Sequence, residues 1–339
     1  MRTIFRVLLL ALAGAASVAS AAPSDDTAAV DLALAMRGAF VERARALQQL
    51  LPHDLRTRVL LSLPPFVTDA DRKLILEDDR DLASLVEEAR GSTDPIVLSH
   101  LARRCGTTGK VCDALQMAQR WVDADTQNQA AWLLLGDMQR ARHDEAAATA
   151  TFLRASRASL WRDYFTETGR HLLRLLPLDL SASDRAEALL TISGVEGLTP
   201  NAFQFIHAEC KDVELRSACH RILTTMYDGA DTLRAMAVVS RVSATCGVPA
   251  LTVAERFKTF DAMGIGIRLV RLPDLDGEAT TDADYAAFNR AFEARLERGE
   301  RVWARTELAA AGLTDEQAAA RARQERVERD GRRMTPAAR

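Results

Sequence analysis

Residues 129–158 read QAAWLLLGDMQRARHDEAAATATFLRASRA, and they carry the clearest structural pattern in the chain. Its apolar residues recur at helical spacing, Ala and Leu are abundant, and a polar turn at His143-Asp144 divides it in two. Ala and Leu are strong helix formers, and a short turn between two helices makes them antiparallel neighbours. The stretch therefore predicts a helical hairpin, with helices over residues 129–142 and 144–157.

Six residues of this hairpin, some small and some bulky, follow one characteristic spacing. They are Trp132, Leu135, Gly136, Ala148, Phe152 and Ala155. Their spacing resembles the tetratricopeptide repeat (TPR), although Gln139 stands where that family usually has Tyr. The resemblance implies that Gly136 and Ala148 lie where two helices touch, and that the larger side chains fill the groove between them. The segment before the hairpin resembles the second helix of an earlier, degenerate repeat, so the TPR-like pair spans about 110–158.

Amphipathic segments with capping and stop signals continue along most of the chain. They predict helices at about 28–51, 54–63, 82–90, 95–105, 110–124, 159–175, 183–193, 200–210, 217–227, 230–245 and 252–262. Short helices joined by short turns are typical of an all-α protein, either an α-solenoid or a pair of helical bundles. We therefore predict an all-α helical-repeat domain over 22–263. The TPR resemblance implies that it is a right-handed α-solenoid of antiparallel helix pairs.

The C-terminal part of the chain has a weaker pattern. We predict an irregular connection over 264–283, which includes a short extended piece at Ile265–Leu272. Further helices are expected over 284–320, where a capping box occupies Thr314–Gln317. The last segment, 321–339, contains seven Arg, three acidic residues and little apolar surface. It is predicted to be a charged helix that frays into a disordered tail.

The sequence also repeats a pattern at long range. Asp79, Arg80, Ala83, Leu85, Pro95 and Cys105 are followed 105 residues later by Asp184, Arg185, Ala188, Leu190, Pro200 and Cys210. In both places a helix that begins at a Pro ends at a Cys, and a second Cys follows a short polar loop. We interpret this echo as two diverged copies of one multi-helix unit.

Residues 1–21 have the three parts of a secretory signal peptide. Arg2 and Arg6 are positive, an apolar core follows at Val7–Ala13, and Ala19-Ser20-Ala21 is a cleavage site. The apolar run is too short for a membrane span, so we expect cleavage near Ala21, no stable membrane insertion afterwards, and a periplasmic or secreted protein. Losing the two Arg changes the net charge from −3 to −5, which gives no reason to expect nucleic acid as a partner.

Five cysteines remain in the mature chain, and an exported protein is expected to oxidise them. Cys105 and Cys112 lie at the end of one predicted helix and the start of the next, and Cys210 and Cys219 repeat this arrangement. We predict two disulfides, each of which clamps a helix turn and stabilises the fold by about 2–3 kcal/mol. Cys246 is left as a buried free thiol, an intermolecular partner or a sign of different pairing.

Metal binding is the alternative for the second pair. His207, Cys210, Cys219 and His220 form the pattern H-x2-C-x8-C-H, with two nitrogen and two sulfur ligands of the kind that zinc binds. The oxidising compartment favours the disulfide, so we predict neither a metal nor a cofactor.

No pattern of a familiar active site occurs in the sequence. H-E-x-x-H, G-x-S-x-G and the phosphate-binding P-loop are all missing. We expect a non-catalytic scaffold that binds an unknown protein or peptide of the cell envelope, because helical repeats bind such partners along their grooves. A metal-binding protein or enzyme centred on the His/Cys quartet is the alternative.

Overall fold

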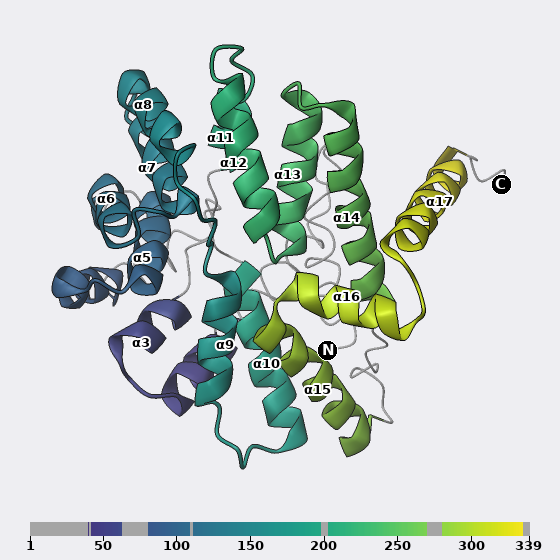
Figure 1. Ribbon diagram of the computed structural model, residues 1–339. Helices are drawn as coiled ribbons and strands as arrows, with labels where there is room; N and C mark the ends of the chain where they lie inside the picture. Colours follow the sequence, from purple (N-terminus) through teal and green to yellow (C-terminus); the bar gives the residue numbers. More distant parts are fainter. Residues whose placement is uncertain are drawn as a thin grey trace.

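The computed structural model describes residues 40, 42–62, 81–108, 111–197, 203–269 and 280–334. Within these ranges the regular structure is helical, apart from one isolated β-bridge between Asn128 and Leu160 (Figure 1). The predicted all-α class is therefore confirmed. The predicted signal peptide and the start of the first predicted helix lie outside the described residues.

Helices begin and end at the following residues. They are α3 (Leu55–Leu61), η2 (Ala89–Gly91), α5 (Pro95–Thr108), α6 (Ala114–Ala124), α7 (Gln129–Ala141), α8 (Glu145–Ala155), α9 (Phe165–Leu175), α10 (Ala182–Gly197), α11 (Phe203–Glu209), α12 (Arg216–Gly229), α13 (Leu233–Thr245), α14 (Ala250–Leu269), α15 (Asp282–Arg298), α16 (Glu300–Ala310) and α17 (Asp315–Met334). Residues 42–50 and 81–88 are also helical.

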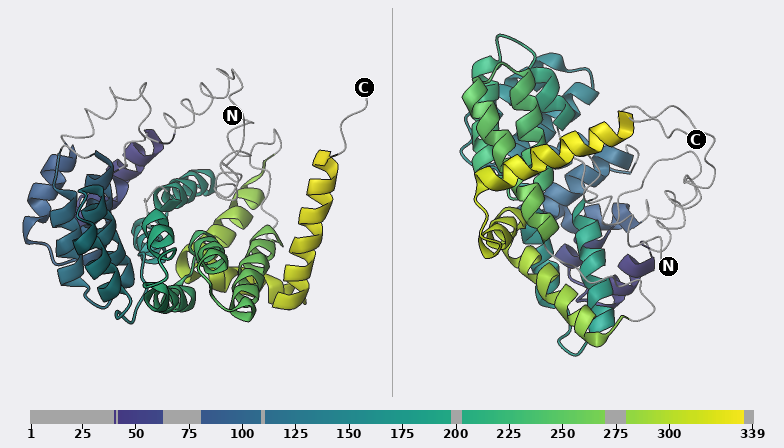
Figure 2. Two further views of the ribbon diagram at one scale, coloured as in Figure 1. Left: turned by 90° about the horizontal axis from the view of Figure 1, so that it is seen from above. Right: turned by 90° about the vertical axis from the view of Figure 1, so that its right-hand side faces the viewer.

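Neighbouring helices along the chain are mostly neighbours in space. α5 packs on α6, α6 on α7, and α7 on α8; later in the chain α12 packs on α13 and α13 on α14. Helices α5 to α8 form a first group and α11 to α14 a second, and the short helix α11 joins the two groups because it contacts both α7 and α13. Seen from above, these helices and α17 follow one another along an arc (Figure 2, left).

The C-terminal helices do not simply extend this row. α15 packs against α9 and α10, which precede it by about a hundred residues, while α16 and α17 both pack on α14. Most buried apolar residues of the two groups, together with those of α9, α10 and α15, form one continuous core, in which Trp121, Phe152, Phe205 and Phe288 are the largest fully buried side chains. A smaller cluster joins the end of α14 to α16 and α17. Helices α15 to α17 therefore pack against helices from the middle and the later part of the chain.

Helix α14 corrects the first part of the irregular connection predicted over 264–283, of which residues 270–279 lie outside the described ranges. The sequence predicted an end near residue 262 and an extended piece from Ile265, yet the helix continues without a break to Leu269. Gly264 and Gly266 explain the weak signal, because glycine lowers helix propensity. Gly266 is buried where α14 meets α16, and this tertiary contact offsets the low propensity.

Helix α17 confirms the charged helix predicted after residue 320 and continues through residue 334, further than a fraying end suggests. Arg326 binds both carboxylate oxygens of the buried Asp261 on α14, at 2.6 and 2.7 Å. Ala318, Ala319 and Ala322 of α17 are buried as well. An arginine-rich helix is thus held by a carboxylate on another helix and by small side chains that allow close approach. Residues 335–339 lie outside the described ranges.

Each of the two groups contains four helices. α5 to α8 are followed by α11 to α14, and Leu233 begins α13 104 positions after Gln129 begins α7. Both helices have 13 residues. The Asn128 side chain caps α7 by accepting the backbone N–H of Ala130, and the Thr232 side chain caps α13 by accepting the backbone N–H of Ala235.

Candidate functional site

The six TPR-like positions lie on α7 and α8, and five of them are buried. Leu135, Ala148, Phe152 and Ala155 are in the core, as is Gly136. Trp132 is only half-buried: its indole Nε1 donates to the carbonyl oxygen of Thr126 at 2.8 Å, and the Arg154 guanidinium lies 5.8 Å from the ring centroid. The structure thus places one aromatic side chain of the hairpin partly at the surface.

Gly136 lies where α7 meets α11 as well as within the hairpin. A Cβ atom at this position would come within 2.6 Å of the Phe205 ring, which belongs to α11. The same ring packs edge-on against Phe152 at 5.8 Å, and Arg140 stacks over it at 5.0 Å while forming an ion pair with Glu209. The small residue therefore admits an aromatic side chain from the next group of helices.

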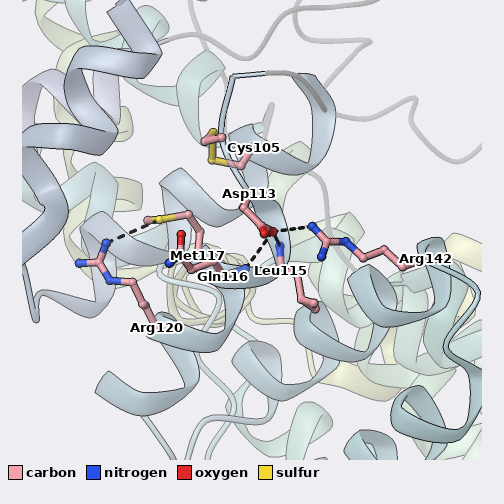
Figure 3. Close-up of a disulfide and its surroundings, with 8 residues drawn as sticks. Cys105, Asp113, Leu115, Gln116, Met117, Arg120 and Arg142 are labelled. Atoms are coloured by element: carbon pink, nitrogen blue, oxygen red, sulfur yellow. Dashed lines mark hydrogen bonds and ion pairs between the residues drawn. A yellow bond between two sulfur atoms is a disulfide. The ribbon is translucent and has the colours of Figure 1, made fainter.

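The first disulfide joins Cys105 of α5 to Cys112, with 5.4 Å between their Cα atoms. Figure 3 shows its surroundings, where Asp113 caps α6. The Asp113 carboxylate accepts the backbone N–H groups of Leu115 and Gln116 at 2.9 and 3.1 Å. It also accepts a hydrogen bond from Arg142 Nη2 at 2.6 Å, so the turn that the disulfide closes is connected to the end of α7.

The second disulfide joins Cys210, which follows α11, to Cys219 in the first part of α12. Their Cα atoms are again 5.4 Å apart. Both predicted pairings are confirmed, and each bond closes the turn between two consecutive helices.

Cys246 is a free and buried thiol at the C-terminal end of α13. Its sulfur and those of Cys210 and Cys219 lie within 4.8 Å of one another. Within the described ranges this is the one group of three or more side chains that could bind a metal ion together, and neither His207 nor His220 belongs to it. The predicted quartet of two His and two Cys is therefore not brought together, and three cysteine sulfurs lie close to one another instead.

A cluster of buried charges was missed by the sequence analysis. It forms where the start of α9, the segment before α13 and the start of α16 meet. Burial, together with the nearby Asp163 carboxylate, raises the pKa of Asp231 from 3.8 to about 7. Thr166 donates its hydroxyl to Asp231, and the backbone N–H of Arg301 donates to the Asp231 carbonyl oxygen at 2.9 Å. These contacts hold three helix ends together.

The same cluster extends through Glu300 at the start of α16. Its carboxylate accepts the backbone N–H of Leu233 at 2.8 Å and pairs with Arg295 at 2.8 Å. On the α5 side, Arg103 donates to the carbonyl oxygen of Asp163 at 3.1 Å. Because its members come from segments far apart in the sequence, no local spacing marks this cluster. The groups that these charged side chains contact lie mostly at helix ends, which indicates that the cluster positions the helices.

His100 of α5 is the buried histidine beside this cluster. Burial, followed by the positive charges of Arg103 and Arg104, lowers its pKa from 6.5 to about 3. Its Nε2 lies 3.1 Å from the Thr168 hydroxyl of α9. The imidazole is therefore neutral at physiological pH and links α5 to α9.

Within the part of the chain that the structure describes, no helix is both long and apolar enough to cross a membrane. In comparisons with known proteins, the chain matches no protein-family model, no curated protein and no solved structure.

Proposed function

We propose that this protein is a non-catalytic scaffold of the cell envelope that binds another protein or a peptide on the surface of its helix row. The observation that carries this proposal is the docking of helices from the two groups onto one another, as the α7–α8 hairpin docks on α11 through Gly136 and Phe205. Stacked hairpins of this kind present extended helical surfaces, and helical repeats bind peptides and protein surfaces along them.

The proposed architecture is a right-handed, TPR-like α-solenoid built from two diverged copies of one unit. Support comes from the matched order and spacing of α5–α8 and α11–α14, and from a disulfide at the first helix turn of each group. The C-terminal helices α15 to α17 then act as a brace rather than as a further copy.

Export is part of the same proposal. Two disulfides fit an oxidising compartment such as the periplasm, where such bonds persist, and the signal-like residues 1–21 supply the route. Each bond closes a short loop and therefore stiffens the turn between two helices. A stiff surface loses less entropy when it binds a partner.

The surface of the α7–α8 hairpin is the proposed contact region. Leu153 on α8 is 38% exposed and Leu160 just after it is 39% exposed. Trp132 is half-buried beside Arg154 on the same hairpin. Aromatic, arginine and leucine side chains at a surface provide apolar contact area together with a cation, which is a composition suited to protein partners.

Photo-crosslinking in living cells tests the proposal. We expect a photoreactive phenylalanine analogue at Leu153 or Leu160 to give discrete, saturable adducts with one envelope protein, identified by mass spectrometry. Leu178, which is 96% exposed in the turn between α9 and α10, is the matched control and should give none. Absence of adducts at both test positions, or equal adducts at the control, would contradict the proposed contact region and its function.

A further inference from the structure

A free thiol lies beside a disulfide in the second group of helices. Cys246 is 3% exposed, Cys210 is also 3% exposed and Cys219 is fully buried. Their three sulfurs lie within 4.8 Å of one another, and only the first two are bonded. Disulfides exchange when a thiolate attacks one of the bonded sulfurs, so a thiol held this close has the partner that the reaction requires.

The three cysteines come from three different elements. Cys210 follows α11, Cys219 lies in α12, and Cys246 caps α13. The observed bond ties α11 to α12, whereas a bond from Cys246 would tie the end of α13 to one of them. Each pairing thus restrains a different pair of helices.

We propose that Cys246 exchanges with the Cys210–Cys219 disulfide, so that the covalent clamp moves from the α11–α12 turn to the end of α13. The Cys246 thiol first gives its proton to water. Its thiolate then forms a bond to the Sγ atom of Cys210 or Cys219, the original S–S bond breaks, and the displaced sulfur leaves as a thiolate that takes up a proton. One disulfide and one thiol are present before and after the step, so it needs no oxidant or reductant.

The chain turns sharply just after Cys246, at the end of α13. Gly247 follows with φ at +68°, a left-handed conformation that glycine adopts without strain. The Arg216 guanidinium of α12 lies against this glycine, and the Thr245 hydroxyl lies 3.6 Å from the Cys246 sulfur. Burial raises the pKa of the Cys246 thiol, while Thr245 and the cation Lys211 oppose that shift. The thiolate is therefore a minor species at neutral pH.

Tryptic mapping of the full mature chain tests the exchange directly. Cleavage after Arg185, Lys211, Arg216, Arg221, Arg241 and Arg256 places the three cysteines in three separate peptides. Protein is incubated at several pH values, quenched with acid, alkylated in denaturant and digested without reduction. We expect Cys246-linked peptides beside the Cys210–Cys219 pair, forming at a rate that rises about tenfold per pH unit below the thiol pKa.

Two single variants keep the test decisive if the exchanged form is scarce. In Cys219→Ser we expect Cys210 to bond with Cys246, and in Cys210→Ser we expect Cys219 to bond with Cys246. The Cys105–Cys112 pair is the matched control, because it should stay unmixed under all conditions. Two free thiols in both oxidised variants, together with complete alkylation of Cys246 in the wild type at every pH, would overturn the proposal.

Discussion

Replacing Gly266 by alanine should destabilise the protein by about 1–3 kcal/mol or more, the usual cost of overpacking a filled interface. A Cβ atom there would lie 2.4 Å from the Ala304 carbonyl oxygen and 2.8 Å from its carbonyl carbon, both in the backbone of α16. Backbone atoms within a helix cannot rotate away as a flexible side chain can. The whole of α16 must therefore shift away from α14.

Gly264→Ala is the matched control for this prediction, because it lies two residues earlier in the same helix. A Cβ atom at Gly264 meets nothing within 4 Å, so alanine should stabilise the protein by about 0.5–1 kcal/mol through its higher helix propensity. Urea unfolding of both variants and the wild type measures the difference. Equal stabilities for the two variants would show that α14 and α16 do not approach each other this closely.

Replacing Asp231 by asparagine should stabilise the protein above about pH 8, by about 1–3 kcal/mol. Burial and the Asp163 carboxylate raise the pKa of Asp231 to about 7, so ionising it within the folded protein is unfavourable. Asparagine keeps an oxygen that accepts the Thr166 hydroxyl and carries no charge to repel the neighbouring acids.

The pH dependence of this effect has a definite sign. A raised pKa in the folded state means that the contribution of Asp231 is fully present below about pH 4 and is lost as the pH rises through about 7, by at most about 1.4 kcal/mol per pH unit. His100 acts oppositely, because its lowered pKa costs stability as the pH falls below 6.5. Because both proteins contain His100, subtracting the unfolding free energy of the wild type from that of the variant at each pH isolates the effect of Asp231. A difference that does not change with pH would contradict the raised pKa.

The sequence predicted the local elements better than their assembly. The α7–α8 hairpin and the two cysteine pairs could be predicted because helix period, turn residues and cysteine spacing are local signals. The role of Gly136 was predicted only in part, since the residue that fills its space, Phe205, lies in another group of helices. Nothing near Gly136 in the sequence indicates that partner.

Long-range partners account for the predictions that were wrong. The charged segment after residue 320 has few apolar residues, and its ordering depends on Asp261, a buried carboxylate on α14 that binds Arg326. Glycines near residue 265 indicated a helix end, and only the approach of α16 explains why the helix continues. The buried Asp231 and the approach of Cys246 to a disulfide likewise arise from tertiary packing alone.

Thiol counting on protein recovered from the cell envelope tests most directly whether the chain is an exported scaffold clamped by disulfides at two helix turns. The protein is denatured without reduction and labelled with a thiol reagent. We expect one free thiol per chain, because two of the five cysteines are bonded in each of two disulfides, and exchange by Cys246 leaves that count unchanged. Five free thiols, or recovery of the chain only from the cytoplasm, would contradict both the clamps and the export.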